Sequence, residues 1–160
     1  MPRTLIAGFG NVLRGDDGFG VEVVRRLGEM REARQEGGDD VALLEVGIGG
    51  IHLAHELLSG YDCLIIIDAM TRGGAPGAVY LLEVEGVEAA ERVDTHLAVP
   101  ASALSVAKAL GALPPRVLLI GCEPGEVDDL STELTPPVRQ AVGTAVRHVH
   151  ELLGWEELAS

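Results

Sequence analysis

The sequence predicts an α/β fold of three layers, in which helices cover both faces of a mostly parallel, twisted sheet of about five strands. Three observations support this class. Apolar runs of strand length alternate with amphipathic segments of helical length along the 160 residues. Glycine-rich turns follow the first two apolar runs. The most apolar run, Cys63 to Ile67, has no polar alternation, as in a strand buried on both faces. Such alternation of strands and helices implies parallel pairing with right-handed crossovers.

The first half of the chain contains three predicted strands and two predicted helices. Thr4 to Phe9 is a short apolar run that is followed by glycine, which is typical of a buried strand. From Gly20 to about Arg34, apolar residues recur at helical spacing with charged residues between them. Val41 to Val46 is the second predicted strand, Ile51 to Leu58 the second helix, and Cys63 to Ile67 the third and central strand.

The second half contains two more strands and two more helices. Ala78 to Val84 alternates weakly, as an edge strand does, and Arg116 to Gly121 is the last apolar run. A helix is predicted from Pro100 or Ala101 to Leu110. The final helix is predicted from Thr135-Pro136-Pro137 to about Leu153, because proline is tolerated in a first turn. We expect one domain over residues 1–160, with a loosely ordered tail at 154–160.

Composition and charge exclude several function classes. The net charge of −13 disfavours nucleic-acid binding, which needs a cationic surface. No apolar run reaches the ~18–20 residues of a membrane helix, and the N-terminal segment lacks the pattern of a signal peptide. We therefore expect a cytoplasmic protein without membrane insertion, with Cys63 and Cys122 as reduced, buried residues. Acidic residues cluster in two stretches that we interpret as ordinary surface charge: Glu83, Glu85, Glu88, Glu91 and Asp94, then Glu123, Glu126, Asp128 and Asp129.

Chemically useful residues follow the first three predicted strands. In a parallel sheet, ligands bind beyond the carboxyl ends of the strands. Gly10 to Asp17 follows the first strand, Gly47 to Gly50 the second, and Asp68 the third. Because neighbouring strands lie about 4.8 Å apart, loops that leave adjacent strand ends can bring carboxylates together.

Asp17, Asp68 and His96 form a candidate metal-binding set. Two carboxylate oxygens and one imidazole nitrogen suit a borderline divalent ion such as nickel, zinc, manganese or cobalt. Three protein ligands leave coordination positions open for water or a substrate group. From the residues alone a simpler interpretation stays open, in which Asp68 caps the following segment and His96 is a solvated loop residue.

The segment GFGNVLRGDDGFGVEVV, from Gly8 to Val24, resembles the signature of the nickel–iron hydrogenase maturation proteases, an endopeptidase family. The later segments IIIDAM, THLAVPASAL, IGCEP and LTPPV resemble further parts of that family in the same order. The resemblance implies an enzyme that removes a C-terminal extension from a hydrogenase large-subunit precursor after nickel is installed. It also implies that Asp17, Asp68 and His96 engage the nickel, which the substrate supplies. Zinc or cadmium would substitute in vitro, and no organic cofactor is expected.

The resemblance leaves the attacking group open. A metal can polarise the peptide carbonyl or activate a bound water. Alternatively, Asp16 or Asp17 acts as a general base; we favour attack by water with a carboxylate as proton acceptor. Asn11 is expected either to orient the loop or a substrate amide, or to be an ordinary turn residue.

The second glycine turn departs from the family pattern. The family typically has Asp-Gly-Gly-Thr-x-Gly there, which bears on substrate recognition, whereas this chain has Glu45-Val46-Gly47-Ile48-Gly49-Gly50. Gly47 and Gly50 match and are candidate substrate-binding residues. The client, and whether the protein is a monomer or a homodimer, are left open.

Other functions remain as alternatives. Gly8-Phe9-Gly10 after a strand is typical of dinucleotide binding, with Glu45 as a possible ribose ligand, but Leu13 occupies the place of the third glycine. A peptidyl-tRNA hydrolase would need a basic groove, which the negative charge disfavours. A non-catalytic chaperone that docks on a metal-loaded partner is the second main alternative.

His52 and His55 do not form the HExxH motif of a zinc peptidase and are expected on a solvated helix face.

Overall fold

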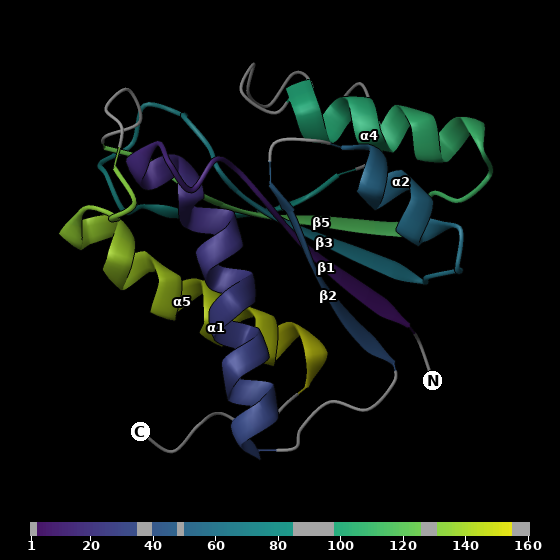
Figure 1. Cartoon of the computed structure of the whole chain (residues 1–160), viewed down its shortest axis with the longest axis horizontal. Helices are drawn as coiled ribbons and strands as arrows, with labels where there is room; N and C mark the ends of the chain where they lie inside the picture. The colour runs from purple at the N-terminus through teal and green to yellow at the C-terminus, as the bar shows by residue number, and fades with distance from the viewer. Residues whose placement is uncertain (1–2, 35–39, 48–49, 85–97, 126–130, 155–160) are drawn as a thin grey trace.

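A computed structural model of the chain describes residues 3–34, 40–47, 50–84, 98–125 and 131–154 (Figure 1). The strands are β1 (Thr4–Phe9), β2 (Val41–Gly47), β3 (Cys63–Ala69), β4 (Val79–Glu83) and β5 (Arg116–Cys122). The helices are α1 (Phe19–Arg34), α2 (Ile51–Leu57), α4 (Ala98–Ala109) and α5 (Pro136–Leu153), and a 3-10 turn, η1 (Gly15–Gly18), precedes α1. Every strand and helix expected from the sequence is present, with small shifts at the ends.

The five strands form one sheet in the order β2-β1-β3-β5-β4. β1 pairs in parallel with β2 and β3, and β3 in parallel with β5, whereas β4 is an antiparallel edge strand. The predicted fold class and the central position of β3 are therefore confirmed. β3 runs two residues beyond its predicted end at Ile67, because Asp68 and Ala69 continue the register opposite Gly121 and Cys122.

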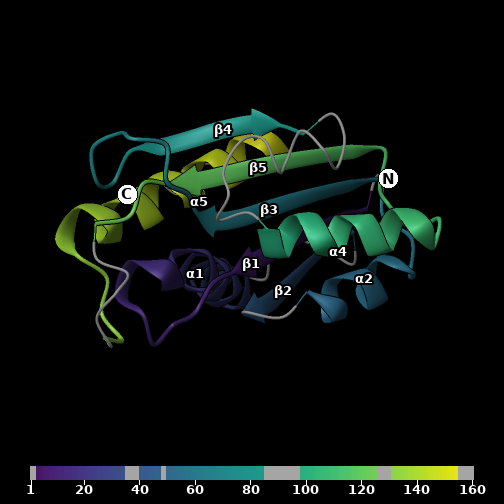
Figure 2. The same cartoon turned by 90° about the horizontal axis from the view of Figure 1, so that it is seen from above.

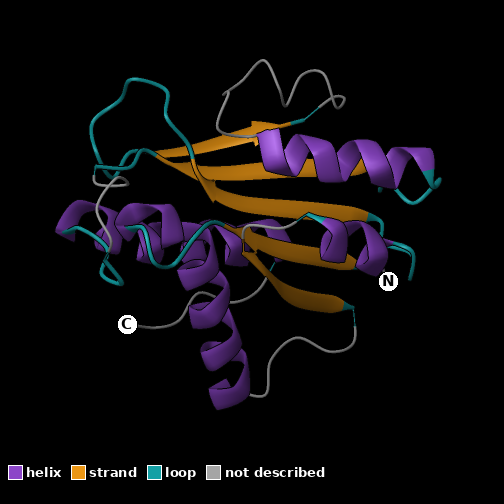
Figure 3. Ribbon diagram, turned by 45° about the horizontal axis from the view of Figure 1, so that its top comes forward, coloured by secondary structure: helices purple, strands orange, loops and turns teal. Residues whose placement is uncertain are grey.

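Helices cover both faces of the sheet (Figures 2 and 3). α1 and α5 pack on one face around Ile6, Ile65 and Ile67. α2 and α4 pack on the other face, where alternate residues such as Leu64 and Ile66 point. The sheet is thus buried on both sides, which explains why its central strand is continuously apolar.

Two glycines set the start of α1 directly on the sheet. A Cβ atom on Gly20 would lie 2.1 Å from the carbonyl oxygen of Ile67 and 2.5 Å from that of Phe9. A Cβ atom on Gly8 would lie 2.4 Å from the carbonyl oxygen of Gly20. Any side chain at these positions would push the helix away, so the glycines fix where the preceding loop lies. That loop is held over the carboxyl ends of β1 and β3.

Both cysteines are free thiols. Cys63 is half-buried, and Cys122 is fully buried in the core, where burial first and the nearby Asp16 and Glu123 charges next raise the pKa of its thiol to about 12. The predicted burial is confirmed for Cys122, whereas Cys63 is only partly buried. None of the described helices combines the length and apolar character needed to cross a bilayer.

Candidate active site

The loop after β1 is shaped by its own polar groups. Gly10 has φ +126°, a conformation that favours glycine. The main-chain N–H of Asn11 donates to Oδ2 of Asp17 at 2.8 Å, and the side-chain oxygen of Asn11 accepts from the N–H of Leu13 at 2.9 Å. This second bond closes a turn around Asn11. The turn-forming role considered for Asn11 therefore has a direct structural basis, whereas contact with a substrate amide stays a prediction.

Gly10 marks the point where the loop after β1 meets the end of β3. A Cβ atom on Gly10 would lie 1.8 Å from the carbonyl oxygen of Asp17 and 3.8 Å from Oδ1 of Asp68. Asp17 and Asp68, which are 51 positions apart in sequence, therefore approach the same glycine. Asp17 is half-buried and Asp68 is 5% exposed. Two of the three predicted metal ligands are thus brought to one edge of the sheet.

Asp16 points into the protein, unlike its neighbour Asp17. Its side chain is fully buried, and its Oδ1 accepts from the main-chain N–H of Thr135 at 2.7 Å. Its Oδ2 accepts from the N–H of Gly125 and from the hydroxyl of Thr135, both at 2.8 Å. Thr135 precedes α5, so the carboxylate also lies at a helix N-terminus, where negative charge is stabilised. This geometry favours an anchoring role for Asp16 over the predicted role as a general base.

Glu123 is a third buried carboxylate at this edge, after Asp16 and Asp68, and no role for it was predicted from the sequence. It is 4% exposed, so its assignment to the surface acids was wrong. Its Oε1 accepts from the N–H of Arg72 at 2.8 Å, from the N–H of Gly74 at 2.9 Å and from the hydroxyl of Tyr80 at 2.8 Å. Burial alone would raise the pKa of the Glu123 carboxyl, but these donors and the N–H of Gly73 outweigh it and hold the pKa below its ordinary value.

The position of Glu123 was a signal that could have identified it. It follows β5 directly, and Asp68 likewise lies at the carboxyl end of β3, where acids on buried parallel strands are at the edge that binds ligands. Asp16 offered no comparable signal, because adjacent residues of a short turn cannot be oriented from sequence alone.

His96, the third predicted metal ligand, lies outside the described residues, and so do Ile48 and Gly49 of the second glycine turn. Gly47 ends β2 opposite Phe9, and Gly50 precedes α2. Within the described part of the chain, no group of three or more His, Cys, Asp or Glu residues could hold a metal ion. The described portion of the predicted set consists of Asp17 and Asp68.

The arrangement restricts the chemistry available at this edge. Cys122 ends β5 beside this site, but its thiol is fully buried and its pKa is raised to about 12, which disfavours the thiolate that a nucleophile needs. Asp17 is only half-buried, so one carboxylate remains reachable by a ligand. Carboxylate oxygens at such a position can bind a cation or accept a proton from water.

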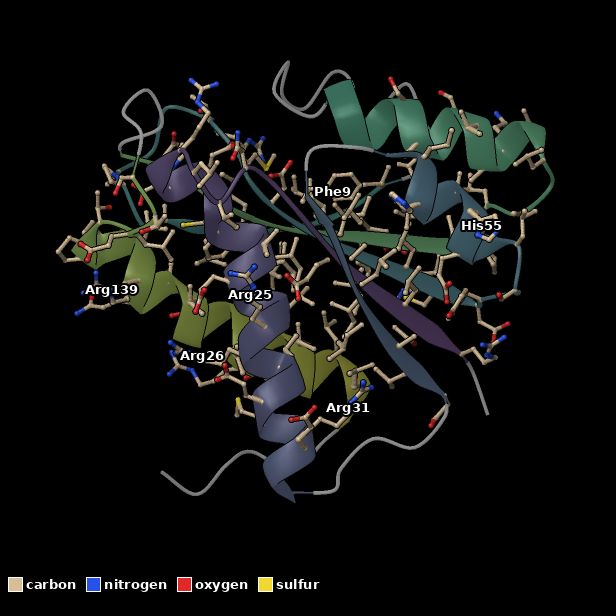
Figure 4. All side chains as sticks on the ribbon, viewed as in Figure 1. Phe9, Arg25, Arg26, Arg31, His55 and Arg139 are labelled. Atoms are coloured by element: carbon tan, nitrogen blue, oxygen red, sulfur yellow. The ribbon has the colours of Figure 1, made fainter. Side chains whose placement is uncertain are left out.

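Other candidate sites have different surroundings. A cavity of about 340 Å³ opens at the amino ends of the strands, among Thr4, Cys63, Arg116 and Leu153, away from Asp17 and Asp68. His52 and His55 are exposed on α2, where Figure 4 shows His55, as the sequence predicted.

Two residues expected at a dinucleotide site, Leu13 and Glu45, lie in surroundings that do not suit such a site. Leu13, at the place of the third glycine, is 55% exposed. The side chain of Glu45, the expected ribose ligand, pairs with Arg25, whose Nε lies 3.0 Å from Oε1. Arg25 lies on α1, as Figure 4 shows. An exposed pair of this kind is typical of a solvated surface.

Known proteins resemble the chain in sequence and in structure. Residues 21–152 match the family described as hydrogenase maturation protease. HoxM of Azotobacter vinelandii, a hydrogenase expression/formation protein, is 37% identical over 155 residues, which cover 95% of this chain and 72% of that protein. The coenzyme F420 hydrogenase subunit delta of Methanothermobacter thermautotrophicus is 30% identical, over 94% of both chains.

Two solved structures extend the likeness to the fold. The hydrogenase maturating endopeptidase HybD from E. coli has a TM-score of 0.80 at 29% identity, over 95% of this chain and 92% of its own. The hydrogenase 2 maturation peptidase from Thaumarchaeota archaeon SCGC_AB-539-E09 has a TM-score of 0.74 at 36% identity, over 96% of this chain and 99% of its own. Sequence and structure therefore point to the same group of peptidases.

Proposed function

The chain belongs to the hydrogenase maturation protease family, and from this premise we propose that it removes the C-terminal extension of a nickel-loaded hydrogenase large-subunit precursor. Its family consists of endopeptidases, which hydrolyse a peptide bond. The client of this particular chain and the position of the cleaved bond are part of the proposal.

Nickel in the precursor is the recognition element in this proposal, and Asp17, Asp68 and His96 bind it. The observation that carries the proposal is that both acids lie beside Gly10: the Asp17 carboxylate accepts from the N–H of the next residue, Asn11, and Oδ1 of Asp68 lies 3.8 Å from the position of a Cβ atom on Gly10. Two carboxylates and an imidazole suit a borderline divalent ion. Zinc or cadmium is expected to bind the same residues in vitro, and no organic cofactor is needed. Gly47 and Gly50, at the neighbouring end of β2, are proposed to contact the client main chain.

The proposed reaction is hydrolysis by water. The bound nickel supplies Lewis-acid chemistry at the scissile carbonyl. A water oxygen bonds to the carbonyl carbon, its proton passes to a carboxylate, and the amine leaves with a proton when the C–N bond breaks. Asp17 is the more suitable acceptor, because both oxygens of Asp16 are held by Thr135 and Gly125. The reaction is proposed to take place in the cytoplasm.

Cleavage of a purified precursor tests the proposal. Wild-type protein is expected to shorten the nickel-loaded precursor and to leave the nickel-free form intact. Asp17→Asn, Asp68→Asn and His96→Ala are each expected to lower the rate at least about 100-fold, because the recognition ion loses a ligand. Asp62→Asn, an exposed acid at the opposite end of β3, serves as the matched control and keeps the wild-type rate.

The outcome also separates an enzyme from a chaperone. Binding of the nickel-loaded precursor without any shortening would support the non-catalytic alternative. Cleavage at wild-type rates in all three variants would remove the proposed site, although not the family.

A further inference from the structure

The 71–77 loop follows β3 and carries a cation, Arg72, at the carboxyl end of the sheet, where Asp68 also lies. Arg72 lies four residues after Asp68, and residues 71–76 are all exposed. The guanidinium of Arg72 lies over the ring of Tyr80, 5.5 Å from its centre. Within the described residues Arg72 forms no ion pair with an acidic side chain. An exposed cation is thus present at the edge of an acidic protein of net charge −13.

Glu123 holds this loop in a fixed conformation. Its carboxylate is cradled by consecutive main-chain N–H groups, from Arg72 to Gly74, in the way that such groups bind anions. The Glu123 main chain adds two bonds, because its N–H donates to Ala78 and its carbonyl accepts from Gly77, each at 2.8 Å. The loop is therefore anchored at both ends although its outer residues are exposed.

Tyr80 connects the anchor to the arginine. Its hydroxyl donates to the same Glu123 oxygen, and its ring supports the guanidinium of Arg72. Gly74 makes room for this arrangement, since a Cβ atom there would lie 2.3 Å from the Tyr80 hydroxyl oxygen. Stacking on an aromatic ring restricts an arginine side chain before any ligand binds, and so reduces the entropy lost on binding.

We propose that Arg72 binds a carboxylate of the client polypeptide beside the scissile bond, and that Glu123 and Tyr80 are positioning residues that present it. The inference rests on the proposed function, because it names the chemistry by which the same edge recognises its client. A guanidinium presents two parallel donors to a carboxylate, so it also fixes orientation. The carboxylate comes either from an acidic side chain or from the end of the extension.

Client affinity and cleavage kinetics test this proposal together. Arg72→Gln is expected to raise KM for the nickel-loaded precursor, and its Kd, about three- to tenfold, with kcat unchanged, because a contact outside the reacting groups is lost. Arg139→Gln is the matched control: it removes the same charge at the start of α5, where the guanidinium donates to the Leu134 carbonyl (Figure 4). We expect no change for this control.

Two further variants test the positioning roles. Glu123→Gln is expected to raise KM by less than Arg72→Gln does. The double variant Arg72→Gln/Glu123→Gln is expected to match Arg72→Gln in KM, because Glu123 acts through Arg72. A purely structural role for Glu123 would add its effect to that of Arg72 and would lower kcat as well, and that result would overturn the positioning role.

Altered clients identify the source of the carboxylate. Clients with single acid-to-amide changes near the cleaved bond, and a client with a C-terminal amide, are measured against wild type and Arg72→Gln. The client that lacks the partner carboxylate is expected to show no difference between the two proteins. Equal KM and Kd for Arg72→Gln and Arg139→Gln would overturn the inference. If wild type binds but does not cleave the precursor, the proposed function fails, and the Kd comparison still decides the role of Arg72.

Discussion

The two ends of the sheet use polar residues in different ways. At the carboxyl end, Asp16 and Glu123 are buried, and each accepts several hydrogen bonds from loops distant in sequence. At the amino end, Arg116 and Glu83 pair at 3.6 Å with both side chains more than half exposed. Arg3 likewise reaches the Ser59 carbonyl at the surface. Buried carboxylates thus fix the loops that bear the candidate site, whereas the contacts at the amino end are exposed to solvent.

The largest difference in unfolding free energy is expected between variants of acids at the two ends of the sheet. Asp16→Ala leaves the N–H groups of Gly125 and Thr135 without their acceptor, which should lower the free energy of unfolding by about 3–5 kcal/mol. Asp62→Ala removes an exposed acceptor of the Arg3 N–H and should cost about 0.5–1 kcal/mol. Urea unfolding of both variants measures the difference. Equal losses would show that the carboxyl end is not specially anchored.

Replacing a glycine by alanine should also destabilise the protein more at the carboxyl end of the sheet than at the amino end. Gly10→Ala combines a positive φ with a Cβ atom 1.8 Å from the Asp17 carbonyl oxygen, and should cost about 3 kcal/mol. Gly111 at the amino end also has a positive φ, +71°, but nothing lies within 4 Å of its Cβ position. Gly111→Ala should therefore cost only about 1–2 kcal/mol. Thermal unfolding compares them, and a larger loss for Gly111→Ala would contradict the close packing at Gly10.

The smallest expected effect is the pH dependence of the unfolding free energy that comes from Glu123. Because the folded-state pKa of Glu123 is lowered, its charged form stabilises the protein above the ordinary glutamate pKa, and this contribution is lost as the pH falls through the folded-state pKa. Wild type should exceed Glu123→Gln in unfolding free energy by about 1–2 kcal/mol at pH 7. The gap should narrow in acid, below about pH 4.5. Urea unfolding at several pH values measures it, and a gap independent of pH would rule out the charge as its source.

The sequence predicted the sheet better than the orientation of the side chains. Hydrophobic periodicity determines which segments are buried. The predicted ends of β3 and α5 therefore differ from the observed ends by no more than two residues. The structure adds that Leu64 and Ile65 point into cores on opposite faces of the sheet, as successive residues of a strand do. β3 extends past Ile67 because β5 continues beside it, and such long-range pairing leaves no local trace in the sequence.

The candidate site was predicted only in part, because contacts between residues distant in sequence also orient its side chains. Position beyond the ends of the first and third strands identified Asp17 and Asp68, and the resemblance implied that they engage nickel. The direction of Asp16 depends on contacts with Gly125 and Thr135, more than 100 residues away, which no local pattern reveals. Glu123 was grouped with surface acids by its neighbours in sequence, although its burial depends on the 71–77 loop.

Crystals soaked with zinc give the most direct test of the central claim, that Asp17, Asp68 and His96 bind one divalent ion. Anomalous scattering at the zinc edge should show an ion about 2.0–2.2 Å from an oxygen of each aspartate and from a ring nitrogen of His96. An ion held elsewhere, for example by His52 and His55, with Asp17 and Asp68 left uncoordinated, would contradict the claim.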